Sequence, residues 1–141
     1  MSKKKTDLAL VINIDGASKG NPGPSGVGVI IRDASDNQVI CDLSEPHGEM
    51  TNNAIEYVAL IRALEYVHVL RASSVTIRSD SQLLVRQMTG EYRVKSRSIE
   101  PLYRWACDLA RTIDSIAFEN VSRENNREAD RLAQQSVRRA R

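Results

Sequence analysis

The period of hydrophobic and polar positions changes several times along the chain, and each change marks a new element. Residues 8–14 are almost all apolar, as expected of a strand buried on both faces, and we expect this strand to end at Asp15. After a loop over 16–25, apolar and polar residues alternate on either side of the turn pair Asp36-Asn37. The predicted strands are residues 8–14, 27–32, 38–43, 75–79 and 116–121.

Helical spacing replaces the alternation after residue 52. Leu60, Ala63, Leu64 and Val67 recur at intervals of three and four residues, which predicts a long helix. Shorter helical segments follow, one of them with Gly90 as its stop signal. The predicted helices are residues 53–70, 81–89, 101–112 and 124–138.

The order of these elements predicts an α/β fold with a five-stranded mixed sheet. The first three strands follow one another directly, so we expect them to be antiparallel. The fourth and fifth are each reached through a helix, and such crossovers give parallel neighbours. Helices should then flank both faces, and a functional site is expected at the carboxyl ends of the parallel strands.

Composition points to one ordinary globular domain over 1–141. The chain has 141 residues, of which 41% are hydrophobic and 27% charged. Cys41 and Cys107 lack the spacing of a metal site or a disulfide framework, and His47 and His68 are too scattered to form a histidine site. No apolar run approaches the ~20 residues of a membrane span, and no secretory signal is visible. We expect a cytoplasmic monomer without membrane contact.

Positive charge is concentrated locally, although the formal net charge is only +2. Lys3, Lys4 and Lys5 belong to a basic N-terminus, residues 1–6, which we expect to be flexible. Two further basic stretches hold Arg86, Arg93, Lys95, Arg97 and Arg104, and Arg123, Arg127, Arg131, Arg138, Arg139 and Arg141. Contact with a phosphate backbone is one interpretation, and a solvated charged face is the other.

Four carboxylates stand where the predicted topology would bring side chains together. Asp15 and Asp80 follow strands, whereas Glu56 and Asp130 lie on or beside the core-facing side of helices. Each also has an ordinary alternative. The alternatives are a turn residue for Asp15, a helix N-cap for Asp80, a capping partner of Asn53 for Glu56, and an ion-pair partner of Arg127 or Arg131 for Asp130.

A gathering of four carboxylates would favour a metal ion. The side chains would repel one another, and hard divalent cations such as Mg²⁺ or Mn²⁺ prefer oxygen ligands. Two such ions can activate water on one side of a phosphodiester and stabilise the leaving oxygen on the other. The pattern therefore favours phosphoryl chemistry without a protein nucleophile.

Four segments in this order resemble type 1 ribonuclease H: INIDGASKGNPGPSGVGVII, TNNAIEYVAL, IRSDSQLLVRQ and RENNREADRLA. The resemblance spans nearly the whole chain. It implies a ribonuclease H-like fold and an endonuclease that hydrolyses the RNA strand of RNA/DNA hybrids, leaving 5′-phosphate and 3′-hydroxyl ends.

The resemblance also implies roles for particular residues. Asp15, Glu56, Asp80 and Asp130 would bind two Mg²⁺ ions, with Mn²⁺ as a substitute. Asp15 would bridge the ions, Asp130 would hold the ion that activates water, and Glu56 and Asp80 would hold the other. The residues implied to contact the RNA strand in the minor groove are Gly16, Asn21, Asn52, Asn53 and Gln82. For Asn21 and Asn53, turn and cap chemistry is nearly as good an explanation.

The chain departs from the family pattern at two places. No histidine stands in the segment 121–126 before the last helix, so we consider Arg123 or Glu124 for the role in proton movement or product release. The region 90–98 is short and lacks the basic handle of some bacterial members, and we expect no separate hybrid-binding domain. The basic run at Arg93, Lys95 and Arg97, or the arginine-rich C-terminus, could replace that grip.

Three other functions remain open at this stage. A non-catalytic module would keep the fold and bind hybrid or double-stranded RNA by shape, but the four acids argue against it. A resolvase or transposase core would act on DNA, whereas the Thr51-Asn52-Asn53 run and the turn at 15–18 favour the ribonuclease. If the chain is a plain structural protein, removing a carboxylate should abolish no activity and should leave stability unchanged or improved.

Overall fold

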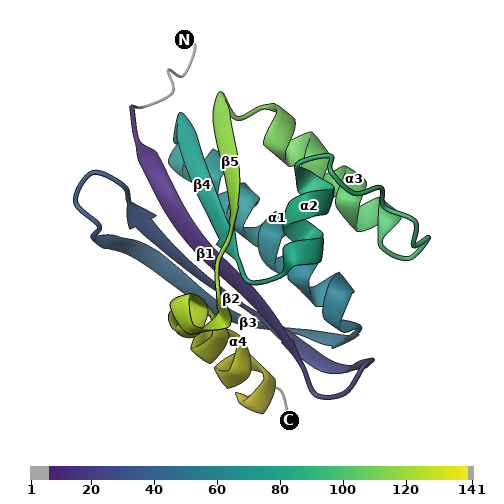
Figure 1. The fold of residues 1–141 in the computed structure, drawn as a ribbon. Helices are drawn as coiled ribbons and strands as arrows, with labels where there is room; N and C mark the ends of the chain where they lie inside the picture. The colour runs from purple at the N-terminus through teal and green to yellow at the C-terminus, as the bar shows by residue number, and fades with distance from the viewer. Residues whose placement is uncertain (1–6, 140–141) are drawn as a thin grey trace.

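The computed structural model describes residues 7–139, and these form one sheet with helices on both sides (Figure 1). The strands are β1 (Ala9–Ser18), β2 (Gly23–Asp33), β3 (Val39–Met50), β4 (Ser74–Ser79) and β5 (Ser115–Asn120). The helices are α1 (Asn52–Leu70), α2 (Gln82–Met88), α3 (Glu100–Arg111), the short 3-10 helix η1 (Arg123–Asn126) and α4 (Arg127–Arg139). The predicted basic N-terminus, residues 1–6, and Arg141 lie outside the described residues. Within 7–139, no helix combines the length and apolar character needed to cross a membrane.

The sheet has the strand order β3-β2-β1-β4-β5. β1 pairs antiparallel with β2, and β2 pairs antiparallel with β3. β4 is parallel both to β1 and to β5, because a helical crossover leads into each later strand. The predicted five-stranded mixed sheet, with its first three strands antiparallel, is therefore confirmed.

The two faces of the sheet are covered by different helices. α1 packs against β1 and β2, and α3 packs on α1, whereas α4 lies across β1, β2 and β3 on the opposite face (Figure 1). The main apolar core lies on the α1 side. Leu10, Ile12 and Ile14 of β1 are at most 2% exposed there, beside Leu60 and Leu64 of α1, which are fully buried.

β1 and β2 are longer than the hydrophobic pattern predicts. Their pairing continues through Asp15 and Gly28 to Ser18 and Ser25, so the prediction that β1 ends at Asp15 is wrong. The predicted loop over 16–25 shrinks to 19–22. The Ser25 hydroxyl donates to the Ser18 hydroxyl at 3.0 Å across the end of the hairpin. The end of β1 was not predicted because its last residues are polar or small and show no hydrophobic alternation.

The last helix also begins differently from its prediction. A regular helix was expected from Glu124, but residues 123–126 form the 3-10 turn η1 and α4 begins only at Arg127. The Ser122 hydroxyl accepts the Asn125 backbone N–H at 3.3 Å and caps this turn. The side chain of Asn126, at the junction, is 1% exposed and reaches into the sheet.

Candidate active site

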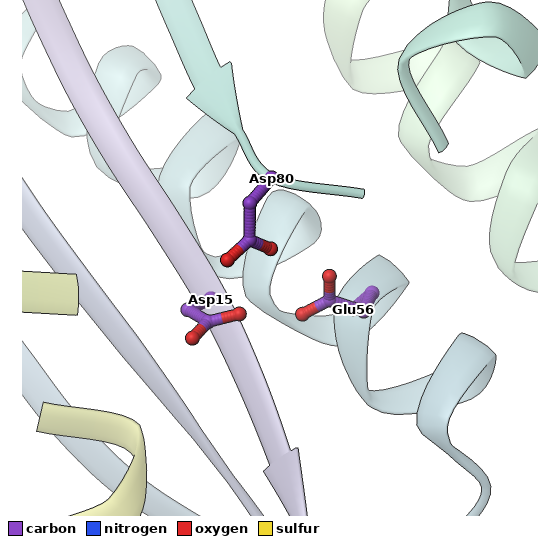
Figure 2. Close-up of side chains that lie close together, drawn as sticks. All are labelled: Asp15, Glu56 and Asp80. Atoms are coloured by element: carbon purple, nitrogen blue, oxygen red, sulfur yellow. The ribbon is translucent and has the colours of Figure 1, made fainter. Parts of the chain in front are cut away.

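Three acidic side chains from three different elements point toward one another beside β1 (Figure 2). Asp15 comes from within β1, Glu56 from α1, and Asp80 from the position directly after β4. One carboxylate oxygen of each lies within 4.8 Å of those of the other two. Hard cations take oxygen ligands at ~2.0–2.6 Å, so one ion can reach all three side chains.

Alternation along β1 sets the direction of the Asp15 side chain. Ile12 and Ile14 face the core on the α1 side, so Asp15 projects from the other face of the strand. Ala17, two residues further along, packs with Ala133 and Val137 of α4, which confirms that alternation. Asp15 is consequently 5% exposed, an unusual burial for a carboxylate.

Gly16 allows α1 to come close to β1. A methyl group at Gly16 would lie 2.8 Å from Cγ2 of Ile55 and 2.9 Å from Oε1 of Glu56. Both distances are shorter than a van der Waals contact, so a side chain at this position would push α1 away from β1. The backbone N–H of Gly16 donates to the Glu56 carboxylate and, at 3.0 Å, to Oδ1 of Asp15. The absence of a side chain at position 16 therefore helps to bring two of the carboxylates together.

The ordinary explanations for three of these acids fail in the structure. Thr51 is the N-cap of α1 and accepts the Ala54 N–H at 3.2 Å, so Glu56 is not a capping partner of Asn53. Ser81 is the N-cap of α2, so Asp80 does not cap that helix. Asp15, within a paired strand, is not a turn residue.

Asp130 approaches the same place from α4. It is not one of the three side chains that meet within 4.8 Å, but it lines the same cleft and hydrogen-bonds with Asp15. In the described part of the chain, Arg127 pairs with Glu124, at 3.5 Å, and neither Arg127 nor Arg131 forms an ion pair with Asp130. The structure thus gathers all four predicted carboxylates around one cleft.

Glycines in β2 set the depth at which α4 lies. Gly28 is the β2 partner of Asp15, and a methyl group there would lie 2.0 Å from the Ala129 carbonyl oxygen. At Gly26 it would lie 1.8 Å from the Ser136 hydroxyl. The bare backbone of β2 lets α4 pack directly on the sheet, and this places Asp130 above Asp15.

The crowding of these acids alters their ionisation. Burial, followed by the charges of Glu56 and Asp80, raises the pKa of Asp15 far above its usual range. Burial is also the largest cause of the raised pKa of Glu56, against which hydrogen bonds from Asp15 and Gly16 act. Burial raises the pKa of Asp80, and the nearby Arg123 guanidinium partly offsets it. Carboxylates held this close, with only oxygen donors, suit a hard divalent cation.

The carboxylates line an open cleft of about 660 Å³. Of the residues predicted to contact RNA, Gly16, Asn52 and Asn53 line this cleft. Asn21 and Gln82 are exposed at its border instead. Oδ1 of Asn21 accepts the backbone N–H of Asn52 at 3.0 Å, and Gln82 follows the cleft residue Ser81.

The structure separates the two candidates that sequence proposed for the missing histidine. Arg123 lines the cleft, and its charge acts on Asp80. Glu124 lines a second cleft with Arg32 and Arg78 and pairs with Arg127. Arg123 is therefore beside the carboxylates, and Glu124 is not.

Several polar residues of the cleft were missed by the sequence analysis. They are Ser18, Ser81, Asn120, Ser122 and Gln134. Two of them had a usable signal: Asn120 ends β5, at the same sheet edge as Asp80, and Gln134 lies one helical turn after Asp130. Ser18 had none, because it belongs to the part of β1 that was predicted as a loop.

Comparison with known proteins finds a family model and curated relatives that match most of the chain. The family described as "Reverse transcriptase-like" matches residues 13–136, which include all four carboxylates. A bifunctional protein of Mycobacterium tuberculosis is 38% identical over 130 residues, which make up 92% of this chain. The chain spans only 36% of that relative's length.

Solved structures share both the fold and much of the sequence. RNase H1 of the archaeon Halobacterium salinarum superposes with a TM-score of 0.90 at 32% identity, over 94% of this chain and 99% of that one. LC11-RNase H1, solved in complex with an RNA/DNA hybrid, superposes with a TM-score of 0.87 at 37% identity, over 93% and 98% of the two chains. The likeness thus extends over more than nine-tenths of this chain.

Proposed function

Because the chain belongs to the type 1 ribonuclease H family, we propose that it is an endonuclease that hydrolyses the RNA strand of RNA/DNA hybrids. The observation that carries this proposal is the meeting of Asp15, Glu56 and Asp80 within 4.8 Å, in a cleft that Asp130 also lines. A relative of similar fold was solved in complex with an RNA/DNA hybrid, which supports the choice of substrate.

The proposed cofactor is Mg²⁺, two ions per site, with Mn²⁺ as a substitute. When bound, two such ions activate a water molecule on one side of a phosphodiester and stabilise the leaving oxygen on the other. Asp15 interacts with each of the other three carboxyl groups, which supports a role for it in holding both ions. Asp130 would then hold the ion on the water side, and Glu56 and Asp80 the ion on the leaving-group side.

The proposed reaction adds a water oxygen to phosphorus and breaks the bond from phosphorus to the 3′ oxygen. The 3′ oxygen takes up a proton, so the products carry a 5′-phosphate and a 3′-hydroxyl. Arg123 suits the stabilisation of the phosphate charge rather than proton transfer, because a guanidinium stays protonated. Its place in the cleft beside Asp80 favours it over Glu124 for product release.

Recognition of the RNA strand is proposed for the end of the cleft formed by Gly16, Asn52 and Asn53. Amide and backbone groups there can hydrogen-bond the 2′-hydroxyls that distinguish RNA from DNA in the minor groove. Asn21 supports this end by accepting the Asn52 N–H at 3.0 Å. Gln82, exposed next to Ser81, would extend the contact at the cleft border.

The segment between α2 and α3 is the proposed contact for the other strand. Its side chains Arg93, Lys95 and Arg97 are exposed. Tyr92 is 45% exposed, and the Arg86 guanidinium lies 5.3 Å from its ring centroid. Exposed cations with an aromatic ring suit phosphates and sugar or base faces, so this segment would take the place of the absent basic handle.

The test is cleavage of an end-labelled RNA/DNA hybrid in the presence of Mg²⁺, Mn²⁺ or EDTA. The wild type should cut only the RNA strand and only with a metal, and Asp80→Asn should abolish cutting. Asp42→Asn is the matched control, because Asp42 is an exposed aspartate of β3 that does not line the cleft. It should cut as the wild type does.

Duplex DNA and duplex RNA serve as the other substrates in the same assay. Tight hybrid binding without cutting under any metal would overturn the proposed catalysis in favour of a shape-reading module. Cutting of duplex DNA would indicate instead a nuclease of the resolvase or transposase type. Cutting of duplex RNA beside the hybrid would widen the substrate class and leave the chemistry unchanged.

A further inference from the structure

Asn126 is a fully buried amide at the joint between η1 and α4. Its side chain is 1% exposed. Nδ2 donates to the Ile14 carbonyl oxygen at 2.8 Å, and Oδ1 accepts from Nδ2 of Asn13 at 2.9 Å. Both partners lie in β1, so this one side chain fastens the start of α4 to the central strand.

These contacts lie next to residues that carry the carboxylates. Ile14 directly precedes Asp15, and the β1–β4 pairing ends at Ile14 and Ser79, next to Asp80. The Asn126 amide also acts on the Asp80 carboxyl group, where it favours the ionised form and so partly offsets the rise in pKa that burial causes. Asp130 lies in the first turn of α4, and α4 begins at the residue directly after Asn126. Asn126 therefore links β1, the end of β4 and the segment that carries Asp130.

We propose that Asn126 is a positioning residue that orients Asp80 and sets the distance of Asp130 from Asp15, so that the four carboxylates can hold divalent cations. The proposal rests on the proposed function for the identity of the site. A fixed amide beside a ligating carboxylate favours one orientation of that carboxylate and leaves its lone pairs available to the cation. Loss of such supporting groups typically lowers metal affinity or activity ~10–100-fold.

Substitution by alanine would leave unsatisfied polar groups in the interior. Asn126→Ala leaves the Ile14 carbonyl and the Asn13 amide without their partner, and buried groups in that state are costly. Some loss of stability is therefore expected whatever the role of Asn126. The test must include a measurement that instability alone does not change.

Gln87 supplies the matched control. It is also a buried amide, 7% exposed, and its Oε1 accepts from the Tyr57 hydroxyl at 2.7 Å. Gln87 does not line the carboxylate cleft. Gln87→Ala should therefore lower stability without changing the affinity of the site for metal.

The experiment measures Mn²⁺ binding to the full chain by calorimetric titration without nucleic acid, at a temperature where circular dichroism shows each variant folded. Asn126→Ala should bind Mn²⁺ ~10–100-fold more weakly and need correspondingly more Mg²⁺ for half-maximal cleavage. Gln87→Ala should stay within about twofold of the wild type in both. Equal Mn²⁺ affinity in wild type and Asn126→Ala would overturn the positioning role.

A second variant covers the case in which Asn126→Ala does not fold. Asn13→Ala removes the amide that donates to Oδ1 of Asn126, and it should weaken Mn²⁺ binding several-fold. An unchanged Mn²⁺ affinity would overturn the proposal.

The direct titration also separates this proposal from the proposed function. If the wild type binds Mn²⁺ but does not cut hybrid, the function fails and the positioning role is still decided by the variants. If the wild type binds no Mn²⁺, the positioning role fails.

Discussion

The two faces of the sheet are packed in different ways. On the α1 side, large side chains such as Ile12, Leu60 and Leu64 form one extended apolar cluster. On the α4 side, the buried apolar cluster is only Ala17, Ala133 and Val137 among the described residues. The remaining contacts on that side are close backbone packing at glycines, buried amides and the carboxylates.

This difference separates stability from chemistry within a single sheet. Burial of large apolar groups supplies most of the free energy of folding, and that burial lies on the α1 side. The α4 side holds Asp15 and Asp130 at close range, an arrangement that opposes folding unless a cation is bound. Substitutions on the two faces should therefore have separable effects on stability and on activity.

The largest expected effect is the loss of activity in Asp15→Asn. The amide keeps the shape of the side chain but loses the charge that interacts with the other three carboxyl groups. A metal site is worth several kcal/mol of transition-state stabilisation, so the rate should fall about 1000-fold or more. Single-turnover cleavage of a labelled hybrid measures this loss. If the variant keeps a tenth of the wild-type rate, Asp15 is not part of the catalytic centre.

On the opposite face, Ile12→Ala should produce the largest loss of stability. Ile12 is fully buried in the α1-side cluster, and truncating such a residue costs about 2–5 kcal/mol. Urea unfolding followed by circular dichroism measures the change. The cleavage rate per folded molecule should stay within about threefold of the wild type. A rate loss as large as that of Asp15→Asn in fully folded protein would show that the two faces are not separable.

Gly28→Ala should affect both properties to an intermediate degree. The added methyl group would lie 2.0 Å from the Ala129 carbonyl oxygen and 2.6 Å from the Ala133 nitrogen, so α4 must move away. Overpacking of this kind costs about 1–3 kcal/mol. The shift of α4 also increases the distance between Asp130 and Asp15. The cleavage rate of the folded variant should therefore fall at least tenfold. Unchanged activity would mean that the depth of α4 on the sheet does not set the site.

The sequence predicted the fold well because the α1 side follows simple hydrophobic patterns. The apolar run before Asp15 and the helical spacing of Leu60, Leu64 and Val67 arise from burial of large side chains, which periodicity detects. The order of strands and helices then restricts the topology to very few choices. The element order and the strand pairing predicted in this way are confirmed.

The α4 side was harder to predict because its packing depends on what is absent or polar. Gly26 and Gly28 bring α4 close through missing side chains, and no hydrophobic period reveals such a contact. The paired end of β1 at Ser18 and the buried amide of Asn126 resemble ordinary loop residues in sequence. The four acids were found because the predicted topology brings two strand ends and two adjoining helices to one edge of the sheet, and because their segments resemble type 1 ribonuclease H. Their distances required the structure.

The smallest expected effect is a pH-dependent difference in stability between the wild type and Asp15→Asn without metal. Burial, and then the charges of Glu56 and Asp80, raises the pKa of Asp15 in the folded state, so above pH ~4 the folded protein holds a proton that the unfolded chain has lost. By linkage, stability contributed at low pH is lost as pH rises toward the raised pKa. Asp15→Asn lacks this titration.

At pH 4, ionisation of Asp15 should therefore contribute almost no difference in stability between the variant and the wild type. At pH 8 the variant should be more stable by about 1–3 kcal/mol, the usual size of a single-site effect. Thermal and urea unfolding in EDTA between pH 4 and 8 measure the difference. Added Mn²⁺ should reduce it at pH 8, because a cation stabilises the ionised Asp15 and binds the variant more weakly. A difference that does not grow with pH would mean that relief of buried charge is not what Asp15→Asn changes.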